Sequence, residues 1–467
     1  MLTIDNGHRR LTRRDLLSVG GLGLAGLSLE SLLAAKAAGA SKRVNPVTGK
    51  SVIFLFQQGG PSQLETFDPK PDAPAAVRTV TETVATSIPG VHFGEAMSKI
   101  AKHADKCTIV RSFQTRNAGH NIQPIVGPDS LNTSIGVHYA RVAGSTRQDS
   151  GFPTNMVLHP DAVRSDVRKG EARGNLSETG SYGKTFAPFI PGGKDKLQHD
   201  MTLSMNRDRF TSRRHLLQSL DQLNLDADAN GEITALTDMQ RQAYELLLGG
   251  GVAKAMDLSQ EDRRTLQRYD SEQYVRNGAW NKVSRGRAGM YTSQAKSIGR
   301  LLLLARRLCE AGCGFITIHA GYAGVWDMHA DGNNLNMVDG MNAVGLSFDH
   351  AVAAFIEDIE SRGMQDDILL VATGEMGRTP RINSRGGRDH WSRLAPLLLY
   401  GAGVPRGAVI GESTRDAGEP ATDAYTPSHL IATILNTVLD PGLLRLVPGV
   451  PAEVTRLTSA SPLPLMV

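Results

Sequence analysis

The chain has 467 residues, enough for one large α/β core with insertions or for two smaller cores. Lys and Arg exceed Asp and Glu by only 51 to 47, and several of the extra positive charges lie within the first 15 residues, so no basic face is expected in the rest of the chain. Aromatic residues make up 5% of the chain and are not interleaved with a basic stripe, so the sequence has no stacking platform for nucleic acid. We therefore expect no nucleic-acid partner.

The N-terminal segment, residues 1–40, has the order of charge and hydrophobicity of a signal peptide. Arg13 and Arg14 precede an apolar, Gly-rich stretch at residues 16–29, and small residues follow. The apolar stretch is shorter than the roughly 20 residues that span a membrane. The paired arginines resemble the twin-arginine export signal, which carries folded proteins. We expect cleavage after Ala37 or Ala40, contact with the membrane only in transit, and a periplasmic or extracellular mature protein; the alternative is an amphipathic N-terminal helix of a cytoplasmic protein.

Apolar runs of the strand type alternate with helical patterns along the chain. The helical patterns include residues 297–311 and 341–362, each closed by a glycine. The strand-type runs lie at residues 51–56, 107–110, 314–319, 368–372 and 394–400. This alternation predicts an α/β fold with a doubly wound, mostly parallel sheet and helices on both faces. We expect a single domain at residues 45–467, in which the polar segment at about 152–294 is a mainly helical insertion.

Polar side chains follow four of these runs. In open α/β sheets, ligands collect beyond the carboxyl ends of the strands, because the loops diverge there and leave a crevice. Oxygen and imidazole donors follow all four of these strand-type runs. Together they favour a divalent metal that holds a hydrolysable anion. The side chains are Gln63 and Glu65 after the first run, Ser112, Thr115 and His120 after the second, Asp327 and His329 after the third, and Glu375, Arg378, Arg388, Asp389 and His390 after the fourth.

The pattern around residue 327 is suited to a metal site. Asp327 and His329 are two apart on an extended segment, so both can ligate one ion. Glu375, Asp389 and His390 can complete that site or hold a second ion. Two ions about 4 Å apart would stabilise both the attacking and the leaving oxygen of a transferring phosphoryl or sulfuryl group. The expected cofactor is one or two ions of zinc, calcium, magnesium or manganese.

Arginines beside these residues supply donors for the anion. Arg378 and Arg388 can form bidentate hydrogen bonds with it, Gln63 is a weaker neutral donor, and Trp391 would shield the ion from bulk water. The alternative is purely structural. In that case Asp327 and Glu375 cap helices, Asp389 and His390 pair with each other, and both arginines hold carboxylates.

Four motifs, in this order behind the leader, resemble a known family. They are GGPSQLETFDPK, WDMH, GEMGRTPRIN and GRDHW, and they are similar to the exported bacterial family called domain of unknown function 1501, a sulfatase-like branch of the alkaline phosphatase superfamily. The resemblance spans nearly the whole chain and implies an alkaline-phosphatase-like fold. It also implies hydrolysis of phosphate or sulfate esters, such as those of a polysaccharide, at a metal centre. The ligands that it implies are Asp327, His329, Glu375, Asp389 and His390.

The chain departs from that family in its first two loops. Gln63 and Glu65 stand where members often have His and Asp, although Glu65 can still ligate. The superfamily reaction resembles attack by a Ser, Thr or formylglycine after the second strand, for which Ser112 and Thr115 are the hydroxyl candidates here. His120 is a candidate ligand or base. The sulfatase pattern Cys-x-Pro-x-Arg is missing, because CTIVR at residues 107–111 has no proline, and this disfavours a sulfatase in the strict sense.

A calcium loop is a further candidate at residues 226–237. DADANGEITALT matches an EF-hand loop at its first positions, but Thr237 replaces the bidentate Glu that closes such a loop. An Asp/Asn/Gly turn between two helices explains the stretch as well.

Two classes of function remain open from the sequence. The first is a metal-dependent hydrolase of phosphate or sulfate esters, with attack by a hydroxyl or by water. The second is a non-catalytic binding protein that keeps the fold and one metal for stability and uses the helical insertion to hold a partner or a glycan.

Overall fold

The computed structural model describes residues 44–168, 170–192, 251–275, 280, 283–321 and 324–465. From Pro46 onward, these residues belong to one compact unit. The expected signal peptide and the EF-hand-like stretch at residues 226–237 lie outside the described residues. Among the described helices, none combines the length and the apolar character that crossing a membrane requires.

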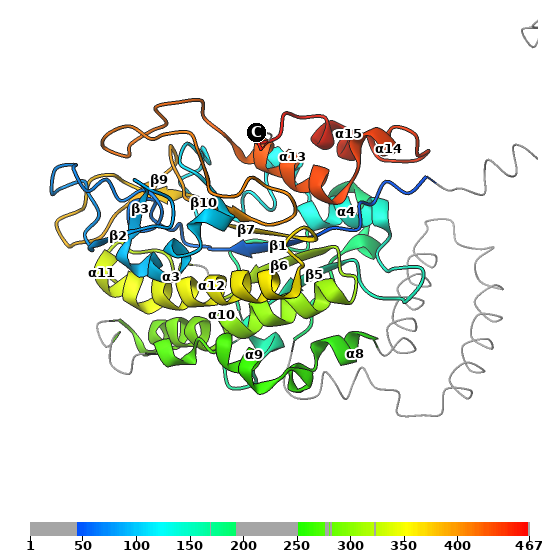
Figure 1. Ribbon diagram of the computed structural model, residues 1–467, viewed down its shortest axis with the longest axis horizontal. Helices are drawn as coiled ribbons and strands as arrows, with labels where there is room; N and C mark the ends of the chain where they lie inside the picture. Colours follow the sequence, from blue (N-terminus) through cyan, green and yellow to red (C-terminus); the bar gives the residue numbers. More distant parts are fainter. Residues whose placement is uncertain are drawn as a thin grey trace, which may run out of the picture. The chain divides into compact units, whose positions relative to one another are not determined.

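A seven-stranded sheet forms the centre of this unit (Figure 1). β10 is antiparallel to both of its neighbours, and every other adjacent pair is parallel. The expected α/β fold with a mostly parallel sheet is therefore confirmed. In spatial order the strands are β11 (Ala408–Ile410), β4 (Cys107–Val110), β10 (Leu397–Tyr400), β7 (Ile368–Thr373), β1 (Ser51–Phe56), β6 (Phe315–His319) and β5 (Asn155–Leu158).

Helices cover both faces of the sheet (Figure 1). Gly363, with φ 68°, ends α12 in the left-handed region that favours glycine. One face is covered by α3 (Ser98–Ala101), α8 (Gly251–Met256), α9 (Arg263–Arg268), α10 (Arg285–Glu310) and α12 (Leu346–Arg362), which continues α11 (Met337–Gly340) and a π-helical turn at Met341–Gly345. The other face is covered by α4 (Ile135–Ala143), α13 (Pro427–Val438), α14 (Pro441–Leu444) and α15 (Ala452–Thr458).

Short elements connect these layers. The two-stranded ribbons are β2 (Thr83–Ala85) with β3 (His92–Gly94), and β8 (Gly377–Arg378) with β9 (His390–Trp391). Single 3-10 turns lie at Glu95–Met97, Ala104–Lys106, Pro128–Ser130, Pro160–Ala162, Gly180–Tyr182, Lys184–Phe186, Leu258–Gln260 and Glu272–Tyr274.

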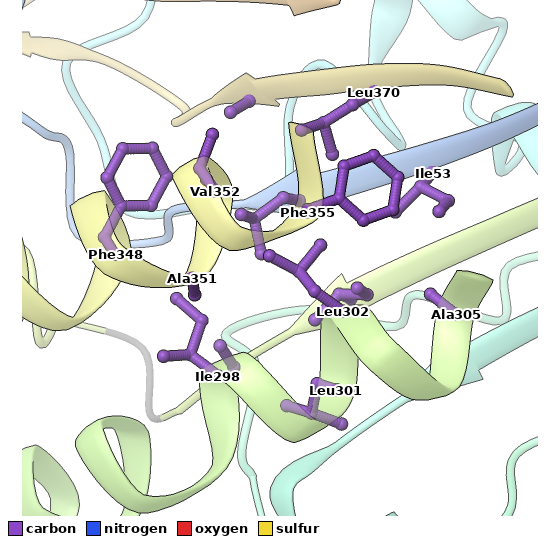
Figure 2. Close-up of a cluster of buried hydrophobic side chains, with 14 of the residues drawn as sticks. Ile53, Ile298, Leu301, Leu302, Ala305, Phe348, Ala351, Val352, Phe355 and Leu370 are labelled. Atoms are coloured by element: carbon purple, nitrogen blue, oxygen red, sulfur yellow. The ribbon is translucent and has the colours of Figure 1, made fainter. Parts of the chain in front are cut away.

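The central strand β1 is buried on both faces, which explains its continuous apolar sequence. Ile53 and Leu55 belong to the core beneath α10 and α12, whereas Val52 and Phe54 belong to the core beneath α13. Figure 2 shows Ile53 in the first of these cores, together with Phe355 of α12 and side chains of α10.

The structure corrects three sequence expectations. The segment at 152–294, expected as a helical insertion, contains β5, an edge strand of the main sheet, and the first part of α10. The run at 394–400 forms a shorter strand, β10, which is antiparallel. β11 was not expected at all. β5 and β11 are the two edge strands of the sheet and have only four and three residues.

We predict that Phe355→Ala lowers the free energy of unfolding by about 3–5 kcal/mol, because it leaves a cavity in a closely packed core. Phe355 is fully buried, whereas Leu446 is 65% exposed. Leu446→Ala is therefore the control, with an expected change within about 0.5 kcal/mol. Urea unfolding of both variants measures the difference, and equal losses would contradict the assignment of Phe355 to the core.

Candidate metal centre

The loops that leave β1, β6 and β7 meet beyond the carboxyl ends of these strands. After β1, the Gly59 N–H donates to both carboxylate oxygens of Glu375, at 2.9 and 3.0 Å. A Cβ at Gly59 would lie 2.8 Å from the backbone nitrogen of Trp326, and Gly59 has φ 122°. Only glycine tolerates both the close approach and this conformation. Gly59 therefore lets the loop after β6 pack directly on the loop after β1.

Four side chains converge where these loops meet. His120, Asp327, His329 and His390 each offer one ligand atom, and these atoms all lie within 4.8 Å of one another. His120 comes from the loop after β4, Asp327 and His329 from the loop after β6, and His390 from β9. Nε2 of His120 lies 2.9 Å from Asp327 Oδ2. Nε2 of His329 and Nε2 of His390 lie 2.6 and 3.3 Å from Asp327 Oδ1.

Each of the three histidines has an acceptor at its other ring nitrogen. Nδ1 of His120 lies 3.0 Å from Glu375 Oε1. Nδ1 of His329 lies 3.2 Å from Asp389 Oδ1, and Nδ1 of His390 lies 2.8 Å from the Ala118 carbonyl oxygen. A carbonyl or carboxylate oxygen can only accept, so each of these partners takes a proton on Nδ1. The Nε2 atoms face the Asp327 carboxylate, which also only accepts, so either a proton or a cation must lie between each Nε2 atom and Asp327.

Two of these Nε2 atoms lie so close that a proton or a cation must lie between them. Nε2 of His329 and Nε2 of His390 are 2.8 Å apart. Two lone pairs at this distance repel each other unless a proton or a metal ion attracts both. Three imidazole nitrogens and one carboxylate oxygen, with the imidazoles oriented by outer partners, form a donor set that fits a metal ion. The four residues therefore form a candidate metal centre.

Charge in the centre is concentrated on Asp327, which is 5% exposed. Burial opposes its ionisation, but hydrogen bonds from the three histidines and the Arg378 guanidinium hold the pKa of this carboxyl well below its usual range. Burial would lower the pKa of His120, yet its hydrogen bonds to Asp327 and Glu375 outweigh burial and raise that pKa above the usual value. Asp327 therefore carries a negative charge at neutral pH, which favours a cation beside it.

Glu375 and Asp389 lie on the outer side of the histidines. Both were expected as ligands, but neither belongs to the cluster of four, because each carboxylate faces an Nδ1 atom instead. Glu375 is fully buried, whereas the Asp389 side chain is 61% exposed. Such carboxylates orient metal-binding imidazoles and increase their basicity.

Arg378 is placed behind Asp327 and does not face the solvent. It is fully buried, and its Nη2 donates to Asp327 Oδ1 at 2.8 Å. The other N–H groups donate to backbone carbonyl oxygens, including that of Gly60 at 2.7 Å and that of Arg388 at 3.2 Å. This arrangement agrees with the alternative in which the arginine holds a carboxylate. A fully buried guanidinium is not accessible to the expected anion.

Glu65 and Arg388 form a buried ion pair away from the four cluster residues. Arg388 Nη2 lies 2.9 Å from Glu65 Oε1, and both side chains are fully buried. Glu65 also accepts from the Val80 N–H at 3.2 Å and from the Ser62 hydroxyl. The expected metal ligand and the expected anion donor therefore neutralise each other. Burial without such pairing would be costly for either charge.

The remaining expected residues also have other partners. Gln63 is buried and forms hydrogen bonds with the backbone N–H and carbonyl of Arg378, at 3.0 and 2.8 Å, in place of the expected anion. The Thr115 hydroxyl donates to the Asn117 carbonyl at 3.2 Å. Ser112 is fully buried against Gly411. None of these three residues has a hydrogen bond with the cluster in the described part of the chain.

Two asparagines that the sequence analysis did not select as site residues support the histidine loops. Nδ2 of Asn117 donates to the Gly119 carbonyl at 2.7 Å, which shapes the turn before His120. Nδ2 of Asn383 donates to the His329 carbonyl at 2.9 Å. Asparagines in loops are common, so no local signal distinguishes these two. Trp391, expected as a shield, is half-buried and donates from Nε1 to the Gly418 carbonyl at 2.6 Å.

Comparison with solved structures finds distant similarity. A sulfatase from Pseudoalteromonas sp. is 11% identical, with 87% of this chain and 71% of that chain covered and a TM-score of 0.34. A phosphonate monoester hydrolase from Silicibacter pomeroyi is 13% identical, with 83% and 73% covered and a TM-score of 0.31. The TAB5 alkaline phosphatase is 13% identical, with 84% and 98% covered and a TM-score of 0.28. Similarity this distant does not assign an activity to this chain.

Comparison by sequence gives a family. No curated protein matches the chain. A family profile described as "Protein of unknown function (DUF1501)" matches residues 49–458, which include all four cluster residues. The chain therefore belongs to the DUF1501 family.

Proposed function

We propose that this protein is a metal-dependent hydrolase of phosphate or sulfate esters that acts outside the cytoplasm. The observation that carries the proposal is the orientation of His120, His329 and His390, whose Nδ1 atoms meet outer acceptors while their Nε2 atoms surround Asp327. A bound divalent ion would act as a Lewis acid that polarises an ester oxygen and makes water nucleophilic.

The donor set favours zinc over calcium, magnesium or manganese. Imidazole suits zinc and other first-row transition ions, whereas calcium and magnesium take oxygen ligands almost entirely. His120, His329 and His390 would supply three nitrogens, and Asp327 one oxygen. Within the described part of the chain one group of four ligands is found, which supports one ion and not the pair that the sequence left open.

The other residues around the centre would orient it and exchange protons. Glu375, which is fully buried, holds Nδ1 of His120 and keeps Nε2 directed at the ion. Asp389, which is largely exposed, holds Nδ1 of His329 and could exchange protons with solvent. Because Arg378 is hydrogen-bonded to protein acceptors, the ester anion would be held chiefly by the cation.

The lack of a side-chain nucleophile in the cluster keeps the second candidate function open. The Ser112 and Thr115 hydroxyls have no hydrogen bond with the described cluster residues. If the protein hydrolyses esters, water must therefore attack directly. If it does not, the same centre would stabilise a binding protein of this family.

We predict that the purified protein binds about one zinc ion per chain, as expected for a centre with four protein ligands. Asp327→Asn and His329→Ala should abolish stoichiometric binding, because each removes one ligand. His103→Ala is the control, since His103 pairs with Glu357, outside the cluster. Metal analysis after dialysis measures the stoichiometry. Retention of a full equivalent by Asp327→Asn would refute the assigned centre.

We predict that the metal-loaded protein hydrolyses an aryl phosphate or an aryl sulfate, and that Asp327→Ala lowers kcat/KM by at least about 100-fold. Ser112→Ala and Thr115→Val should keep at least about half of the activity, because their hydroxyls lie outside the cluster. Steady-state assays with both esters make the comparison. Full metal occupancy with no turnover of either ester would favour the binding protein, and loss of activity in Ser112→Ala would restore a serine nucleophile.

We also propose export by the twin-arginine route, on the basis of Arg13 and Arg14 in the leader. Replacing both with lysine should leave the protein uncleaved and in the cytoplasm, since the receptor reads the arginine pair. Cell fractionation with immunoblotting measures the distribution. A processed, exported double-lysine variant would show that another signal is used.

A further inference from the structure

Gln58 lies directly after β1 and connects three separate segments. It is 2% exposed. Its Nε2 donates to the Asn121 carbonyl at 2.5 Å and to the Arg173 carbonyl at 3.4 Å. Its Oε1 accepts from the Arg173 N–H at 3.1 Å and lies 3.0 Å from His319 Nε2. Every polar atom of the side chain is therefore hydrogen-bonded within the protein interior.

These contacts reach two of the loops that supply the metal centre. Asn121 follows His120 directly, so the Nε2 contact fixes the backbone beside that ligand. The backbone carbonyl of Gln58 accepts from the Gly324 N–H at 3.3 Å. Gly324 and Asp327 belong to one turn, because the Asp327 N–H donates to the Gly324 carbonyl at 3.1 Å. Gln58 thus links the backbone of the His120 loop to that of the Asp327 loop.

His319, at the end of β6, completes this connection. Gln58 Oε1 can only accept, so His319 must carry its proton on Nε2. Burial lowers the pKa of His319 to about 3, so the ring is neutral at neutral pH. His319 Nδ1 and Gln294 Nε2 have no hydrogen-bond partner among the described residues, and both side chains line a cavity of about 10 Å³. That volume suits one water, which would donate to His319 Nδ1 and accept from Gln294 Nε2.

We propose that Gln58 is a positioning residue for the metal centre, which holds the His120 loop at a fixed distance from the Asp327 loop with His319 as its support. This inference rests on the proposed function for its metal, but the coupling of the two loops belongs to the polypeptide alone. The loops come from strands that are not adjacent in the sheet, so no strand pairing sets the spacing between them.

Gln58→Met tests the proposal, because methionine keeps the volume of the side chain and removes its hydrogen bonds. We expect zinc affinity to fall about 10- to 100-fold, as when other outer supports of a metal site are removed. The visible absorption spectrum of the Co²⁺-loaded variant should change, since it reports ligand geometry. In the metal-free protein, amide hydrogen exchange should become faster at residues 115–121, because methionine removes the bond to the Asn121 carbonyl, whereas the backbone bond between Gln58 and Gly324 remains.

Leu435→Ala is the control for a merely structural loss. Leu435 is fully buried in the core beneath α13, so this variant should lose about 2–5 kcal/mol of stability while keeping the zinc affinity and the Co²⁺ spectrum. His319→Leu should act like Gln58→Met, whereas His319→Gln, whose amide can still donate to Gln58, should stay close to wild type. This pair provides the same test if Gln58→Met fails to fold.

Two results would overturn the proposal. One is a Gln58→Met protein with wild-type zinc affinity and Co²⁺ spectrum. The other is unchanged exchange at residues 115–121 of the metal-free variant. Failure of the proposed function would give a different combination of zinc binding and hydrogen exchange. In that case the wild-type protein binds no zinc, but exchange at residues 115–121 still rises in Gln58→Met, which supports the crosslink and rejects the metal.

Discussion

The Asp327 carboxylate is the group on which the rest of the candidate metal centre depends. Its two oxygens meet the Nε2 atoms of three histidines, and Arg378 donates to Oδ1 from the protein side. A buried carboxylate is stable only when such partners compensate for lost hydration. Arg378 therefore does not compete with a cation for the centre. It keeps Asp327 ionised from the protein side, and the imidazoles contact the same carboxylate from the loops.

The sheet makes this convergence possible. β1, β6 and β7 are adjacent and parallel, so their carboxyl ends deliver the Gly59, Asp327 and Glu375 loops to one edge. β4 is separated from them by the antiparallel β10, and its loop carries His120. The His120 loop must therefore cross the end of β10 to reach the cluster, and a crosslink such as the one from Gln58 to Asn121 fixes where it arrives.

Residue types and strand exits predicted much of this arrangement. The long apolar runs identified β1, β4, β6 and β7, because buried parallel strands are continuous in hydrophobicity. The polar residues that follow the carboxyl ends of these strands then included Asp327, His329 and His390. The sequence could not predict which charged residues that are far apart in the chain pair with each other. Arg388 and Glu65 are 323 positions apart, and nothing local indicates that they neutralise each other and not a ligand. His120 was selected as a ligand or base, but its outer partner Glu375 could be recognised only in three dimensions.

The position of the carboxylates explains why one ion is favoured over two. The sequence places five acidic or imidazole side chains in the last two loops of the site, enough for a second ion if all of them ligated. Glu375 and Asp389 instead accept from Nδ1 atoms, and Glu375 also accepts from the Gly59 N–H. A carboxylate oxygen that orients a histidine in this way strengthens the first site at the expense of a second one. The same acidic residues that suggested a binuclear centre in the sequence therefore orient the ligands of the single ion that we propose.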